Sequence, residues 1–175
     1  HLVTYYNAVQ PLEQVFDGFF IGWRHISGST PLAGQITMPE VVNLRTDLDV
    51  PVIVVNSAAE AIAHYPARQV DSEVYRLWEI AGSAHTNAFW APQMFEIMQR
   101  DFGLPIPECE GHFNAVPSQY VMNAAISHLA RWVRDDVLPP AFQPLQPLGS
   151  FSQQFNATLQ MAESFQLARY KPAGR

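Results

Sequence analysis

The sequence predicts an α/β protein in which parallel strands are flanked by helices. Two observations lead to this fold class. Mostly apolar runs of strand length recur along the chain, and helical patterns or loops rich in proline and glycine separate them. One of these runs is continuously apolar, which is typical of a parallel strand buried on both faces.

Three segments are the expected strands. Residues 15–22 read VFDGFFIG, residues 49–56 read DVPVIVVN, and residues 74–81 read VYRLWEIA. The second is the clearest, because its centre is β-branched and its flanks are polar. Three strands make a small sheet, so we expect part of the fold to lie outside this sequence.

Helices are expected over residues 58–64, 87–102 and 117–133, and residues 2–9 could be the end of another. Pro66 follows the first helix, and Pro92 falls near the first turn of the second, where proline is tolerated. Apolar residues of the second helix share one face: Phe89, Met94, Ile97 and Met98. The third has the clearest helical stripe: Val121, Ala124, Ala125, Leu129 and Trp132.

The chain of 175 residues is long enough for one domain. We place that domain at residues 1–142. The remaining residues, 143–175, form an irregular or partly helical tail of unknown role. Residues 27–49 read as a long loop or excursion, because they are rich in Gly, Pro, Ser, Thr and Asp.

The composition excludes several classes of function. The net charge of −6 argues against nucleic acid as a partner. No run of 18 apolar residues occurs, so we expect no transmembrane segment. The single cysteine, Cys109, excludes an intrachain disulfide and a zinc site built from several cysteines. The first residue is His1 rather than Met. The localisation stays open between an exported and a cytoplasmic protein.

A carboxylate and a histidine follow two successive strands, where the sites of open parallel sheets form. Glu60 ends the run Ser57-Ala58-Ala59-Glu60, and His85 ends the run Gly82-Ser83-Ala84-His85. A carboxylate that accepts a hydrogen bond from one imidazole nitrogen leaves the other nitrogen free to act as a base. The alternatives are an exposed histidine in a turn and a glutamate on a solvated helix face.

Phe89 and Trp90 follow His85 closely enough to flank such a site and to bind substrate there. Trp23 is a further aromatic candidate for lining a pocket. Core packing is the alternative role for all three side chains.

The run YRLWEIAGSAH, residues 75–85, resembles the segment that carries the catalytic histidine in bacterial α/β-hydrolase domain proteins, where this residue lies in a G-[ST]-A-H motif. VPVIVVNSAAEA, residues 50–61, resembles the strand and acid turn of the same group, and residues 120–140 resemble its final helix. The resemblance implies that His85 is the catalytic base and Glu60 the acid of a serine hydrolase. Its substrate would be a small-molecule carboxylic ester, and no metal or organic cofactor would be needed.

One motif of the family is missing from the sequence: there is no G-x-S-x-G elbow to carry the nucleophile. We therefore expect the chain to be the C-terminal part of an α/β-hydrolase fold, with the serine and the first strands upstream. The missing N-terminal half or another chain would complete the sheet. The alternative is a non-catalytic, hydrolase-derived fragment or subunit that acts as a binding or structural module.

Overall fold

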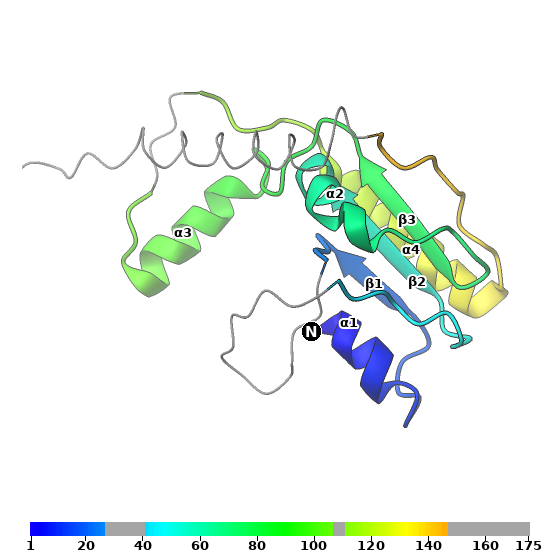
Figure 1. The fold of residues 1–175 in the computed structure, drawn as a ribbon. Helices are drawn as coiled ribbons and strands as arrows, with labels where there is room; N and C mark the ends of the chain where they lie inside the picture. The colour runs from blue at the N-terminus through cyan, green and yellow to red at the C-terminus, as the bar shows by residue number, and fades with distance from the viewer. Residues whose placement is uncertain (27–40, 107–110, 147–175) are drawn as a thin grey trace, which may run out of the picture.

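A computed structural model describes residues 1–26, 41–106 and 111–146. It contains a parallel sheet of three strands in the order β1-β2-β3 (Figure 1). The strands are β1 (Phe19–Gly22), β2 (Val52–Ser57) and β3 (Tyr75–Ile80). Helices flank the sheet, and the predicted fold class is therefore confirmed.

The strands β1 and β2 begin later than the sequence pattern predicts. Val15 and Phe16 are exposed and precede the sheet ladder. Pro51 has no N–H group to donate, so the ladder of β2 starts at Val52. The carbonyl of Pro51 still accepts a hydrogen bond of 2.8 Å from the backbone N–H of Phe19.

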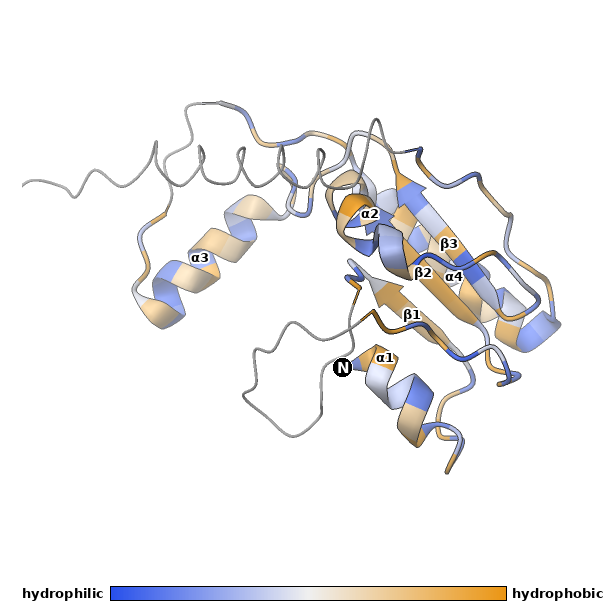
Figure 2. Ribbon diagram, in the orientation of Figure 1, coloured by the Kyte–Doolittle hydropathy of each residue, from blue (hydrophilic) through white to orange (hydrophobic). Residues whose placement is uncertain are grey.

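The central strand β2 is buried along its whole length. Figure 2 shows that most of this strand is hydrophobic. Its side chains alternate between two apolar clusters. Ile53 and Val55 belong to the cluster beneath α4, whereas Val52 and Val54 belong to the cluster on the opposite face. Burial on both sides explains why the sequence of this strand is continuously apolar.

Helix α4 (Ser118–Asp135) covers one face of the sheet. The predicted stripe is wrong at one position, because Ala124 is exposed and Met122 packs on the sheet in its place. Gly18, just before β1, allows the helix to approach closely. A Cβ atom at this glycine would lie 2.7 Å from Cγ2 of Val133.

The other face carries α1 (Leu2–Thr4), which continues as a π-helical segment, η1 (Tyr5–Val9), and α2 (Ala58–His64) (Figure 1). A short 3-10 helix, η2 (Tyr65–Ala67), follows α2. The bounds of α2 agree with the prediction. Within η1, the hydroxyl of Tyr6 donates a hydrogen bond of 3.1 Å to the carbonyl of Val50.

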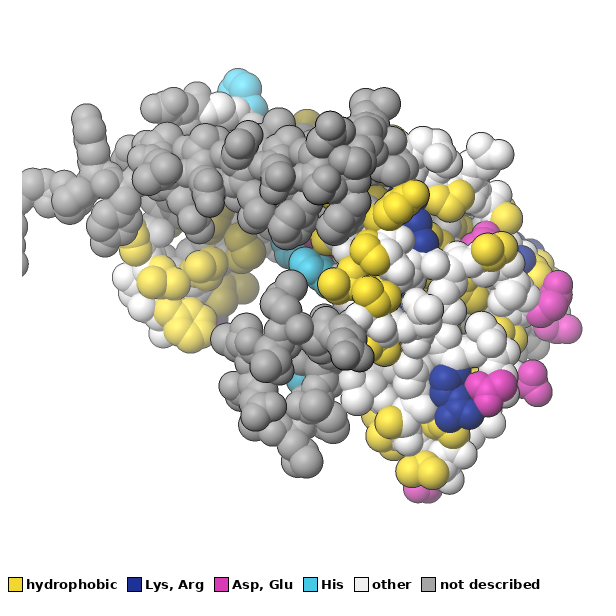
Figure 3. Space-filling model, in the orientation of Figure 1, with side chains coloured by type: hydrophobic (Ala, Val, Ile, Leu, Met, Phe, Trp, Pro, Cys, Tyr) yellow, Lys and Arg dark blue, Asp and Glu magenta, His cyan; other side chains and the backbone are white. Residues whose placement is uncertain are grey.

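Helix α3 (Ala91–Phe102) stands apart from the sheet (Figure 1). It begins four residues later than predicted, and it is capped by Gly103, whose φ of 65° is left-handed. Met94 and Ile97, on its predicted apolar face, are exposed. Figure 3 shows hydrophobic side chains at the surface over this helix.

Several sequence predictions lie outside the described residues. They concern Cys109, residues 27–40 of the predicted loop, and residues 147–175 of the predicted tail. In the part of the chain that is described, no helix is long and apolar enough to cross a membrane.

Candidate functional site

The structure brings Glu60 and His85 together at the carboxyl ends of β2 and β3. Oε1 of Glu60 lies 2.6 Å from Nδ1 of His85. The two side chains differ in burial, since that of Glu60 is 5% exposed and that of His85 is 61% exposed. A buried carboxylate thus holds an imidazole whose far edge faces solvent.

Glu60 owes its position to the first turn of α2. Ser57 is the N-cap of this helix, and its hydroxyl oxygen accepts hydrogen bonds from the backbone N–H groups of Ala59 (3.2 Å) and Glu60 (3.4 Å). The same hydroxyl group donates to Oε2 of Glu60. Sequence reasoning missed Ser57, although serine followed three residues later by glutamate is a known helix-start pattern.

A second serine links the turn that carries His85 to the turn that carries Glu60 by a hydrogen bond. Gly82 has a φ of 67°, which a glycine adopts without strain. The Ser83 hydroxyl group donates to the carbonyl of Ile80 (2.7 Å) and accepts from the backbone N–H of Ala58 (3.3 Å). This contact fixes the spacing between the two turns.

Trp23 is the aromatic candidate that lies beside His85. The two ring centroids are 6.1 Å apart, and the rings are tilted by 43°. Trp23 follows β1 and has a φ of 54°, an unusual backbone conformation for a bulky side chain. Its backbone N–H donates a hydrogen bond of 2.9 Å to the carbonyl of Val55.

Phe89 and Trp90 pack against each other rather than against the His85 ring. Their ring centroids are 5.1 Å apart in an edge-on arrangement, and both side chains are about half exposed. Phe89 also lines a cavity of about 260 Å³, together with residues 114–117. Trp90 is not among the residues that line this cavity.

Asn87 anchors the segment that leaves the histidine turn. It is buried, and its side-chain amide donates to the carbonyl of Val116 (3.1 Å) and to the hydroxyl of Ser118 (2.9 Å). Its side-chain oxygen accepts from the backbone N–H groups of Phe89 and Trp90. This turn explains the late start of α3, and a lone asparagine gave the sequence analysis no signal for it.

The arrangement suits His85 to proton transfer. With Nδ1 directed at Glu60, Nε2 is the nitrogen that can accept a proton, and no described residue forms a hydrogen bond with it. Neither serine of the two turns is placed as a nucleophile. Ser57 donates its hydroxyl hydrogen to Glu60, and Ser83 donates its own to Ile80.

A group of buried polar side chains lies on the α2 side of the sheet. Arg24 is buried, and it donates to the carbonyl of Val42 (2.5 Å), while its Nε and one terminal nitrogen have no hydrogen-bond partner among the described residues. Burial lowers the pKa of Arg24. His64 is fully buried, and burial, reinforced by the charges of Arg24 and Arg68, lowers its pKa to about 3. His64 is therefore neutral at physiological pH.

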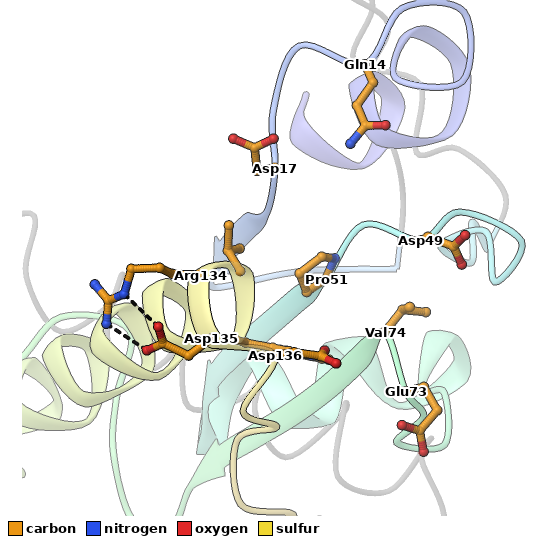
Figure 4. A pocket seen from close by; sticks show the side chains of 11 residues that line it. Gln14, Asp17, Asp49, Pro51, Glu73, Val74, Arg134, Asp135 and Asp136 are labelled. Carbon is orange, nitrogen blue, oxygen red and sulfur yellow. Dashed lines mark hydrogen bonds and ion pairs between the residues drawn. The ribbon is translucent and has the colours of Figure 1, made fainter.

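A cleft of about 1000 Å³ lies at the opposite end of the sheet (Figure 4). It is acidic, and its one cation, Arg134, pairs with Asp135 at 2.8 Å. Neither Glu60 nor His85 lines it. In the described ranges, no three His, Cys, Asp or Glu side chains are grouped so that they could hold a metal ion. The carboxylates that line the cleft are Asp17, Asp49, Glu73, Asp135 and Asp136.

Comparison with known proteins adds one finding to this geometry. No curated protein and no solved structure matches the chain. A family model described as an alpha/beta hydrolase domain matches residues 1–162. Since the match covers most of the chain, and the parallel sheet agrees with it, the protein belongs to the α/β-hydrolase domain family.

Proposed function

We propose that the chain supplies the histidine and the acid of a serine hydrolase that cleaves small carboxylic esters by acyl transfer. The observation that carries this proposal is the 2.6 Å contact between buried Glu60 and exposed His85. Membership of a hydrolase-fold family supports it. The proposal assigns no role to a metal or an organic cofactor.

In the proposed reaction, Nε2 of His85 removes the proton of a serine hydroxyl as the serine oxygen attacks the ester carbonyl. Collapse of the tetrahedral intermediate breaks the ester bond, and the imidazolium returns the proton to the departing alkoxide. Water then releases the acyl group by the same steps. Glu60 keeps the imidazole oriented and stabilises its protonated form without itself taking the proton.

The proposal places the nucleophilic serine upstream of His1. No serine in the sequence has a glycine two residues before it, as the nucleophile elbow requires. Ser57 and Ser83 hold other hydrogen bonds, as described above. We propose substrate contacts for Phe89, which lines the nearby cavity, and for Trp90, which packs on it.

One observation favours a second function, a subunit that acts only after another chain completes its sheet. Among the described residues, β1 pairs with β2 alone, which leaves its outer backbone groups available to another strand. Such a module would bind a partner through β1 and would need no chemistry at His85.

The test is the intact mass of the purified protein before and after exposure to a fluorophosphonate probe, which labels activated serines. We expect a mass well above the 19.7 kDa of these residues and a single adduct. Replacing His85 with Ala should slow labelling by about 10⁶-fold, because the serine loses its base. Glu60→Gln should have a smaller effect, about 10⁴-fold, since the base remains but the amide no longer fixes the same tautomer.

The matched control is His112→Ala, which removes an exposed histidine outside the site. It should label at the rate of the unmodified protein. A single adduct that forms equally fast without His85 would contradict the triad. A mass of 19.7 kDa without an adduct would favour the binding module.

A further inference from the structure

We infer that Ser57 is a positioning residue, whose hydroxyl group directs the Glu60 carboxylate at His85. The inference rests on the proposed function, since it concerns how the acid of that site is held. It goes beyond the proposal by assigning a role to a residue that touches neither the substrate nor His85. Three contacts on one hydroxyl group carry it.

Every hydrogen-bonding capacity of the Ser57 hydroxyl group is used. Its oxygen accepts from the backbone N–H groups of Ala59 and Glu60, and a hydroxyl has two acceptor sites. Its single hydrogen is then left for Oε2 of Glu60. The residue is fully buried, so water does not compete for these contacts.

Glu60 needs such a partner because its carboxylate is buried. Oε1 meets Nδ1 of His85 and Oε2 meets the Ser57 hydroxyl, so each oxygen has one hydrogen bond. A buried carboxylate oxygen without a partner is costly, and a free glutamate side chain has many rotamers. The serine therefore selects the side-chain conformation in which the other oxygen faces His85.

This geometry departs from the usual helix-start pattern. In a capping box, the glutamate three residues after the serine reaches back to the backbone N–H of that serine. Here the Glu60 carboxylate bonds to the Ser57 hydroxyl and to His85 instead. A purely structural cap would not require this arrangement, whereas a site that needs an oriented carboxylate does.

The test separates capping from positioning. Glycine is nearly as good an N-cap as serine but has no hydroxyl group, so Ser57→Gly removes the donor to Glu60 and keeps most of the cap. Ser57→Thr keeps the hydroxyl group. Nitrogen-15 NMR of the His85 ring in the full chain reports which ring nitrogen carries the proton when the imidazole is neutral.

We expect the Nδ1–H form to dominate in the unmodified chain and in Ser57→Thr. The ratio of Nδ1–H to Nε2–H should fall about tenfold in Ser57→Gly, the effect of losing a hydrogen bond to a charged group. Ser72→Ala is the matched control, because the Ser72 hydroxyl also accepts a backbone N–H, that of Val74, but lies far from the site. This variant should leave the ratio unchanged.

A second variant separates failure of this inference from failure of the proposed function. Glu60→Gln must lower the Nδ1–H fraction if Glu60 orients His85 at all. If Glu60→Gln lowers it and Ser57→Gly does not, Ser57 is only a helix cap and the inference is overturned. If neither variant changes the ratio, the acid role of Glu60 in the proposed function falls as well.

Discussion

The two faces of the sheet bury an arginine each, but in different ways. On the α4 face, Arg76 donates to the carbonyls of Pro139 (3.0 Å) and Tyr75 (2.9 Å), and its guanidinium lies 5.5 Å from the ring centroid of Trp132. On the α2 face, Arg24 has one side-chain hydrogen bond to a described residue. Burial is therefore similar, whereas the satisfaction of polar atoms is not.

This difference in hydrogen bonding shows that the two faces of the sheet have different roles. The α4 face is an apolar cluster around Trp78, Ala125 and Trp132, and it supplies stability. The α2 face adds charged and polar groups to its apolar cluster, and it adjoins the turn that holds Glu60. Substitutions on the α4 face should change the free energy of unfolding through packing. Substitutions on the α2 face should change it through charge, and so with a dependence on pH.

The largest effect on stability is expected at Trp132 of the α4 face. Its side chain is buried between the helix and the sheet. Trp132→Ala should lower the free energy of unfolding by about 3–5 kcal/mol, because it leaves a large cavity. Chemical denaturation measures this loss. Ile126→Ala, at an exposed position of the same helix, is the control, and an equal loss there would contradict the assignment.

A smaller effect is expected at the buried ion pair of the α2 face. Arg68 binds both carboxylate oxygens of Glu79, at 2.9 and 2.7 Å, and the side chain of Glu79 is inaccessible to solvent. Glu79→Gln should cost about 3 kcal/mol in denaturation experiments, because the Arg68 charge loses its partner. The exposed pair Arg100–Asp101 is the control, and Asp101→Asn should have little effect there.

The subtlest difference between the faces is a pH dependence that comes from His64. Its pKa is lowered to about 3, mainly by burial, so the unfolded chain binds a proton below pH 6.5 that the folded chain does not. Stability should therefore fall as the pH drops below about 6.5, by up to about 1.4 kcal/mol per pH unit. Denaturation at pH 7, 6 and 5 measures the slope. His64→Gln should flatten it, whereas an unchanged slope would exclude this histidine as the cause.

The elements that sequence could predict are those with a strong pattern. The apolar run of β2 and the bounds of α2, with Pro66 behind it, were predicted because local residues determine them. The stripe of α4 was wrong at Ala124 because Ala124 and Met122 flank the shared apolar face on opposite sides, and only contact with the sheet selects Met122. The apolar face of α3 predicted a helix but not what that helix would pack against.

The candidate site was predictable in part for the same reason. Parallel strands place their carboxyl ends at one edge, so the proximity of Glu60 and His85 followed from topology. The contacts of Ser57 and Trp23 depend on how side chains and backbone turn at that edge. The spacing of Ser57 and Glu60 indicates a helix cap, but it does not specify those angles, so the contact between the two side chains could not be predicted.

Two requirements conflict at Trp23: its left-handed backbone favours glycine, whereas the contact with His85 needs an aromatic side chain. A non-glycine residue at a φ of 54° carries a strain of about 1–2 kcal/mol, from which glycine is free. Glycine there would relax the backbone and keep the N–H bond to Val55, but it would remove the ring beside His85. The tryptophan therefore keeps an aromatic contact with His85 while its backbone stays strained.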